Sequence, residues 1–267
     1  MPTSFDDLLA RTRATPPGPA TTTIPPDWGQ GRSSFGGLIV ALALERMRLH
    51  VAPDRRPRSL LVAFVGPVEP GSEVAIDVEV LREGRSATQL EARVRSAGAL
   101  ACTVSAAFAG DRPSKLDVPS RAAPERPGPE GLFALPFIPG LTPAFTQHVE
   151  LRWALGGPPY SRQPLPEQSG WCRFREGELA REEHVLALVD AWPAPVLQTL
   201  REPTVASSMT WMLEFVESET DTRADAWHRF DAGTDRAAGG WTHIHGALWG
   251  PSGRLVALSR QTVAVFA

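Results

Sequence analysis

The chain has 267 residues, 42% of them hydrophobic, which is enough for a large core in one big domain or two of ordinary size. Its formal net charge of −3 argues against a general nucleic-acid binder, because such proteins concentrate basic side chains on one surface. No apolar run approaches the roughly 20 residues that cross a bilayer. The first residues lack a basic patch followed by an apolar stretch, so we expect no secretory signal.

Cysteine and lysine usage narrows the possible chemistry. Cys102 and Cys172 are the only cysteines, so we expect no disulfide framework, two small buried side chains, and a cytoplasmic location. Lys115 is the only lysine and stands in a Pro-rich, polar segment. Because arginine forms no Schiff base, neither pyridoxal phosphate nor a phosphate-loop lysine is expected. We therefore predict no cofactor.

The first part of the chain predicts two helices and several strands. A short helix is expected at 4–13, and a strand begins at Thr21 and stops before Pro25. A Gly-rich loop at 27–34 leads into an apolar helix at 35–44, whose small residues would let a sheet or a ligand come close. Alternating or apolar strands follow at 60–65, 74–81, 90–94 and 100–108.

The second part predicts the same order of elements. The Pro- and Gly-rich residues 110–142 are typical of a linker, and strands are expected at 145–155 and 170–174. A second helix covers about 181–200, where Pro193 and Pro195 should kink or split it. Four strands then end the chain, at about 204–217, 225–233, 238–249 and 254–266.

A buried helix followed by about four long strands thus occurs twice. This predicts an α+β protein with two similar halves that share one sheet system. We place an N-terminal domain at 1–112, a Pro-rich linker at 113–143 and a C-terminal domain at 144–267.

Three side chains are candidates for catalysis. Asp190 lies in an otherwise apolar helix, where burial would raise its pKa towards that of a general base, although it can also be a structural helix-edge residue. Gln261 shares its strand phase with Val263 and Val265, so it should point inward and hold a water, a substrate oxygen or neighbouring backbone. Ser207 is in phase with Trp211, and its hydroxyl can bind a water or its own backbone.

Other polar residues suggest weaker alternatives. His243 and His245 share one face of a strand, and His228 lies across a predicted hairpin, so the three can be considered as zinc ligands. No fourth ligand stands out, and we predict no metal site. The chain also lacks a dinucleotide-binding glycine pattern, a nucleophile elbow and a zinc-protease motif.

Four stretches match the pattern of a known family: Gln30-Gly31-Arg32, Phe35-Gly36-Gly37-Leu38, the apolar helix around Asp190, and Ser259-Arg260-Gln261. Together they resemble the acyl-CoA thioesterase II family. The resemblance implies two fused hotdog domains, each a curved antiparallel sheet wrapped around a long central helix. It also implies hydrolysis of an acyl-CoA substrate, of which CoA is part.

The resemblance assigns roles to individual residues. In the family an aspartate, a threonine and a glutamine position the attacking water, and here they match Asp190, Ser207 and Gln261. Thr210 is a competing hydroxyl in the other strand phase. The resemblance implies that the acyl chain lies between helix and sheet, and Gly36, Gly37 and Trp192 are our candidates for substrate binding.

Two other functions remain open at this point. A hotdog enoyl-CoA hydratase would use an Asp/His pair in a hydratase motif that this chain does not show. A non-catalytic acyl or acyl-CoA binding protein is the other, because Ser208-Met209-Thr210 replaces the Asp-His pair that often follows the family's threonine. We expect neither nucleic-acid nor membrane partners, and a monomer or a homo-oligomer.

Overall fold

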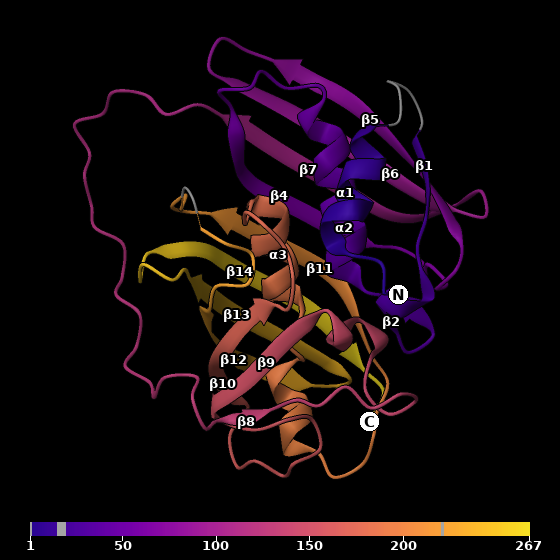
Figure 1. The fold of residues 1–267 in the computed structure, drawn as a ribbon, viewed down its shortest axis with the longest axis vertical. Coiled ribbons are helices and arrows are strands. Elements are labelled where there is room, and N and C mark those ends of the chain that lie inside the picture. Colours follow the sequence, from indigo (N-terminus) through magenta and orange to yellow (C-terminus); the bar gives the residue numbers. More distant parts are fainter. Residues whose placement is uncertain (1, 15–19, 220–221) are drawn as a thin grey trace.

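The computed structural model describes residues 2–14, 20–219 and 222–267. Their strands form an antiparallel sheet of twelve strands, with α2 (Gly36–Arg48) and α3 (Glu182–Asp190) packed side by side against it (Figure 1). This arrangement places one helix of each half at the centre of the molecule.

The N-terminal half runs to the end of the seventh strand. Its elements are α1 (Phe5–Ala14), β1 (Ala20–Thr23), η1 (Pro26–Trp28), β2 (Gly29–Gln30), β3 (Ser33–Ser34), α2, β4 (Arg56–Phe64), β5 (Glu73–Glu83), β6 (Ala87–Ser96) and β7 (Ala99–Ala109). In the large sheet they lie in the order β1-β5-β6-β7-β4, while β2 and β3 pair only with each other.

The C-terminal half supplies the rest of the sheet. Its elements are β8 (Phe133–Ala134), η2 (Ala144–Gln147), β9 (Val149–Leu155), β10 (Glu167–Phe174), α3, η3 (Pro195–Thr199), β11 (Ala206–Phe215), β12 (His228–Ala238), β13 (Trp241–Trp249) and β14 (Leu255–Val265). They lie in the order β11-β14-β13-β12-β10-β9-β8, and β11 pairs with β4 to join the halves.

The predicted repeat of a helix followed by four strands is confirmed. After each helix the four strands take the same spatial order, second, third, fourth and then first: β5-β6-β7-β4 in one half and β12-β13-β14-β11 in the other. The pairing of β4 with β11 joins the two equivalent first strands, for example at Leu60 and Leu213. The two halves therefore meet through matching edges.

Three local predictions differ from the structure. The strand expected from residue 145 begins at Val149, because the segment after Pro143 forms the 3-10 helix η2. The strand expected to end at 233 continues to Ala238, because Gly239 and Gly240 adopt positive φ values of 61° and 81° and close a tight hairpin. A short strand, β8, also lies within the predicted linker and pairs with β9. The predicted split of the second helix is confirmed by α3 and η3.

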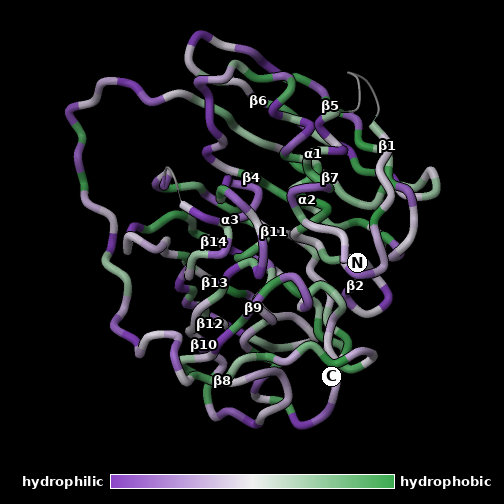
Figure 2. Tube along the Cα trace, in the orientation of Figure 1, coloured by the Kyte–Doolittle hydropathy of each residue, from purple (hydrophilic) through white to green (hydrophobic). Residues whose placement is uncertain are grey.

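One hydrophobic core spans both halves. It includes Leu38 and Leu42 from α2, Phe108 from β7, Phe174 from β10 and Leu188 from α3. Figure 2 shows hydrophobic residues along α2 and the strands near it, with hydrophilic residues at many outer loops. Within the described part of the chain, no helix has both the length and the apolar character needed to cross a membrane.

Buried ion pairs fix the two central helices relative to each other. Glu45 of α2, 1% exposed, accepts hydrogen bonds from Arg13 and from Arg181, the latter at 2.8 Å. Arg48 of α2 donates to Glu183 of α3 at 2.5 Å. Loss of one partner would leave a buried charge uncompensated, so these pairs define one relative position of α2 and α3.

Candidate active site

The structure brings Asp190 and Gln261 together. Asp190 is the last residue of α3, and Gln261 lies in the middle of β14. The Gln261 Nε2 donates a hydrogen bond to Asp190 Oδ1 at 2.9 Å. Because Nε2 points at Asp190, the Gln261 carbonyl oxygen is the atom that can accept a hydrogen bond from a water or a ligand.

The N-terminal half supplies a second hydrogen bond to the Asp190 carboxylate. The backbone N–H of Gly37, in the first turn of α2, donates to Asp190. A Cβ atom at Gly36 would lie 3.0 Å from Asp190 Oδ2, and one at Gly37 would lie 3.1 Å from the Ala187 Cα. The two glycines, which we predicted to bind substrate, thus let the positive end of α2 reach a carboxylate of the other half.

Burial makes Asp190 a base suited to neutral pH. Its side chain is only partly accessible, and desolvation of the charged form raises its pKa from 3.8 to about 6. The hydrogen bonds from Gln261 and Gly37 act in the opposite direction and lower the pKa. At pH 7 the carboxylate is therefore ionised but more basic than an exposed aspartate.

The predicted strand phase of Ser207 is wrong. Met209 has no partner on β14, so a β-bulge separates Ser208, which pairs with Val263, from Thr210, which pairs with Thr262. Directly paired residues share a face, and Val263 shares its face with Gln261. Ser208 therefore lies on the inner face with Gln261, whereas Ser207 and Thr210 are exposed on the outer face.

Sequence reasoning missed Ser208 because a bulge inverts the alternation of side chains at that point. No turn residue or glycine marks the bulge, so residues 206–211 read as one regular strand. Only the register against β14 reveals the inversion.

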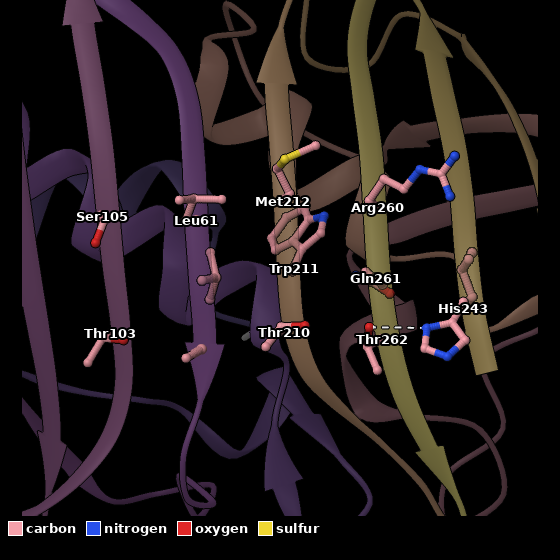
Figure 3. A pocket seen from close by; sticks show the side chains of 13 residues that line it. Leu61, Thr103, Ser105, Thr210, Trp211, Met212, His243, Arg260, Gln261 and Thr262 are labelled. Atoms are coloured by element: carbon pink, nitrogen blue, oxygen red, sulfur yellow. Dashed lines mark hydrogen bonds between the residues drawn. The ribbon is translucent and has the colours of Figure 1, made fainter. Parts of the chain in front are cut away.

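Thr210 lines a trough on the outer face of the sheet, and Gln261 also borders this trough. The trough has a volume of about 480 Å³ and crosses β7, β4, β11, β14 and β13. Figure 3 shows Thr210, Thr262 and His243 along it, with Leu61 and Met212 on neighbouring strands. Asp190 does not line this trough.

Burial keeps the two cysteines protonated, and two of the histidines have other partners. Burial raises the pKa of the Cys172 thiol to about 12, and burial together with the Asp190 charge does the same for Cys102. Neither thiol is a thiolate at neutral pH. His228 is buried beside the Ala226 carbonyl, while His245 is half exposed and pairs with Asp235. No group of three His, Cys, Asp or Glu side chains gathers among the described residues.

Two family models match this sequence. The acyl-CoA thioesterase N-terminal domain matches residues 24–109, and the acyl-CoA thioesterase C-terminal domain matches residues 119–265. None of the curated proteins compared with the chain matches it. The matches to thioesterase domains favour neither the hydratase nor the non-catalytic binding protein.

Solved structures share the fold over nearly the whole chain. A protein of unknown function with a hot dog fold from Alicyclobacillus acidocaldarius is 20% identical, with a TM-score of 0.86, and the match covers 100% of this chain and 99% of that one. The tesB protein of Mycobacterium avium subspecies paratuberculosis is 19% identical, with a TM-score of 0.81 and coverage of 99% and 100%. The acyl-CoA thioesterase II TesB2 of Mycobacterium marinum is 18% identical, with a TM-score of 0.76 and coverage of 97% and 98%.

These structural matches establish the hotdog fold, and the family models establish the family. The C-terminal model alone covers more than half of the chain, and the N-terminal model covers most of the remainder. This protein therefore belongs to the acyl-CoA thioesterase family and is a thioester hydrolase.

Proposed function

We propose that a water activated by Asp190 hydrolyses an acyl-CoA thioester at the junction of the two halves. The observation that carries the proposal is the Asp190–Gln261 hydrogen bond of 2.9 Å, made by a carboxylate whose pKa is raised by burial to about 6. A base with a pKa close to the working pH is ionised and still accepts a proton readily.

Asp190 takes a proton from water while the water oxygen attacks the thioester carbonyl carbon. The carbon–sulfur bond of the resulting tetrahedral intermediate then breaks, and the proton on Asp190 passes to the departing sulfur. The products are a free carboxylic acid and CoA as its thiol.

The first turn of α2 is the proposed oxyanion site. The first amides of a helix have no partner within the helix and point along its positive end. The Gly37 amide donates its hydrogen bond to Asp190. Gly36 precedes it, and a Cβ atom placed on Gly36 would lie 3.0 Å from Asp190 Oδ2. We assign the Gly36 amide to the carbonyl oxygen of the thioester, where negative charge develops during the attack.

Ser208 is our candidate for the third polar group in place of Ser207. It lies on the inner face two positions from Gln261 in register, where its hydroxyl can hold the attacking water. We expect Ser208→Ala to lower kcat/KM for acyl-CoA hydrolysis about tenfold, because one hydrogen bond to the water is lost. Ser207→Ala, its exposed neighbour, is the matched control and should change kcat/KM less than twofold. Equal effects of the two substitutions would contradict the assignment.

Gly36 offers a test from the other half of the chain. A Cβ at this position would lie 3.0 Å from Asp190 Oδ2 and 3.2 Å from the Phe64 ring, so Gly36→Ala should displace the carboxylate. We expect kcat/KM to fall by about 10- to 100-fold, because small misplacements of a base are costly. Gly66→Ala is the control, since its Cβ would meet nothing closer than 3.4 Å. Unchanged turnover in Gly36→Ala would remove α2 from the site.

The wider assignments are also proposals. The repeated helix-and-strand order supports two hotdog domains at 1–112 and 144–267, and the α2–α3 contact supplies a complete site within one chain. Two free, buried cysteines are consistent with work in the cytoplasm. The mechanism uses no cofactor. Thiol release from acetyl-, butanoyl-, octanoyl- and palmitoyl-CoA tests the proposed function, and absence of release from all four would overturn it.

A further inference from the structure

The turn that follows α3 is held against strand β10 by two contacts. Gln168 of β10, which is 2% exposed, donates a hydrogen bond from Nε2 to the Pro193 carbonyl at 2.6 Å. Two positions along the same strand, a Cβ at Gly170 would lie 2.6 Å from the Trp192 ring, so the glycine leaves room for the indole. Because Trp192 and Pro193 come shortly after Asp190, these contacts place β10 directly behind the catalytic end of α3.

The end of α3 gains little stability from its own sequence. It has no basic side chain in its last turn, and Asp190 puts a negative charge at the negative end of the helix. Pro193 lacks the backbone N–H that would continue the helical hydrogen bonds. The position of the Asp190 carboxylate therefore depends on how the next residues are attached to the sheet.

A small pocket lies beside this turn and reaches strand β14. Its lining includes Gln168 from β10 and both Ser259 and Gln261 from β14. Gln168 and Ser259 belong to one row across the sheet, and the two residues between them are the small Ala232 and Gly246. These small residues leave a gap of about 10 Å³, which is room for about one water molecule.

Gln168 brings a buried acceptor to this pocket. Since the Pro193 carbonyl can only accept, Nε2 must face it, and this fixes Oε1 as the remaining atom of the amide. The buried Oε1 receives no hydrogen bond from any residue that the structure describes. A buried acceptor without a donor costs free energy, and an ordered water with about three partners is the usual way to satisfy it.

The Trp192 indole N–H is a second buried group without a hydrogen bond to the described residues, but it faces another neighbour. Burial raises the pKa of the Cys172 thiol, and the Trp192 N–H acts in the opposite direction. The indole N–H is therefore directed towards the Cys172 sulfur, and the acceptor of Gln168 needs its donor from elsewhere.

Two groups of β14 can complete the partners of a water in this pocket. The Ser259 hydroxyl oxygen accepts from Trp211 Nε1 at 2.9 Å, so its own hydrogen can be donated. The Gln261 amide directs Nε2 to Asp190, which leaves its carbonyl oxygen as an acceptor. That oxygen has two lone pairs, so it can accept from a buried water and from the attacking water together.

We propose that Gln168 is a positioning residue for the hydrolysis: its Nε2 holds the turn after Asp190, and its Oε1 binds one buried water that links this turn to Gln261. The water donates one hydrogen to the Oε1 atom of each glutamine and accepts one from the Ser259 hydroxyl. Both partners of the Asp190–Gln261 hydrogen bond are thereby tied to one side chain of β10. This inference rests on the roles proposed above for Asp190 and Gln261.

Gln168→Met tests the inference, because methionine has a similar volume and makes neither bond. With the acyl-CoA that the wild type hydrolyses fastest, we expect kcat to fall about tenfold and KM to change less than twofold, since the base is misplaced while the substrate contacts remain. The acidic limb of the profile of kcat/KM against pH should move to higher pH, because a weaker hydrogen bond from Gln261 raises the pKa of Asp190.

Gln198→Met is the matched control. Gln198 is also 2% exposed, and it makes three hydrogen bonds, to the Gly157 amide and to the Leu165 and Glu167 carbonyls. These partners lie in the loop before β10 and at its first residue, away from the turn after Asp190. This variant should lose at least as much Tm as Gln168→Met, yet keep kcat within twofold and leave the acidic limb in place. Equal losses of kcat in the two variants, with no movement of the limb, would make Gln168 merely structural and overturn the inference.

A double-mutant cycle and a crystal structure test the link through the water. In the Gln261→Leu background, Gln168→Met should lower kcat about threefold or less, because part of what Gln168 supports is already gone. A full tenfold loss in that background overturns the link. Crystals of the wild type should show one water within hydrogen-bond distance of Oε1 of both glutamines, and a wild-type pocket without it overturns the link as well.

The wild-type activity separates this inference from the proposed function. Thiol release by the wild type, together with an unchanged kcat and acidic limb in Gln168→Met, overturns only the role of Gln168. If the wild type releases no thiol from acetyl-, butanoyl-, octanoyl- or palmitoyl-CoA, the proposed function falls and this inference falls with it.

Discussion

Replacement of Asp190 by asparagine should abolish most hydrolysis while leaving a folded protein. Asparagine has nearly the same shape and keeps an oxygen that can accept the hydrogen bond from Gln261 Nε2, which the wild type makes at 2.9 Å. It cannot take a proton from water, so we expect kcat for acyl-CoA hydrolysis to fall by about 10²- to 10⁴-fold, the usual contribution of general base catalysis. Thiol release under saturating substrate measures the loss.

The same substitution should alter stability in a direction that depends on pH. The pKa of Asp190 rises from 3.8 to about 6 on folding, so its contribution favours the folded state below pH 3.8 and is lost as the pH rises through 6. A shift of this size corresponds to at most about 3 kcal/mol, and the amide group of asparagine offsets part of it by facing one of the donors. The Tm of Asp190→Asn relative to wild type should therefore increase between pH 4 and pH 8.

Asp225→Asn is a suitable control, because this aspartate pairs with Arg223 at the surface and its pKa is lowered, not raised. It should retain wild-type turnover. If Asp190→Asn kept more than a tenth of wild-type kcat, Asp190 would not be the base, whatever its stability profile.

The helices and strands of this fold can be predicted from the spacing of hydrophobic residues and from a few residues that end helices or form turns. The apolar run at 38–44 predicts a helix buried on all sides, and α2 is buried over nearly its whole length. Pro193 predicts the end of α3, since a proline cannot continue the hydrogen bonding of a helix. These signals are local, which is why they survive in a single sequence.

The failures arise where long-range pairing decides the outcome. The bulge at Met209 inverts the faces of Ser207 and Ser208, yet nothing within residues 206–211 marks it. It is defined only by the register against β14, a strand about 50 residues later.

The contact between the first turn of α2 and Asp190 could not be predicted from local sequence either. The sequence marked Gly36 and Gly37 as places of close approach, but it could not say what approaches. The answer depends on how α2 and α3 pack, which buried pairs such as Arg48–Glu183 help to fix. Asp190 of one half takes a hydrogen bond from Gly37 of the other half, so the proposed site would need both halves.

Substitution of Gln261 by leucine should both slow hydrolysis and change its pH dependence. Leucine removes the donor to Asp190 and the carbonyl that orients the water in the proposed mechanism, and we expect kcat/KM to fall by about 10²-fold. In the wild type, the hydrogen bond from Gln261 lowers the pKa of Asp190. Without this bond, the pKa of Asp190 should rise above 6. The acidic limb of the profile of kcat/KM against pH should therefore move to higher pH, because Asp190 stays protonated, and inactive as a base, up to a higher pH.

This displacement distinguishes a group that acts through Asp190 from one that only fills space. Thr262→Val, a change to the next residue of β14 on the outer face, is the matched control and should move neither the rate nor the acidic limb. A rate loss in Gln261→Leu with the limb still near pH 6 would mean that Gln261 serves the substrate or the water without tuning the base. An unchanged rate would exclude Gln261 from the reaction, and with it the geometry on which the proposed mechanism is built.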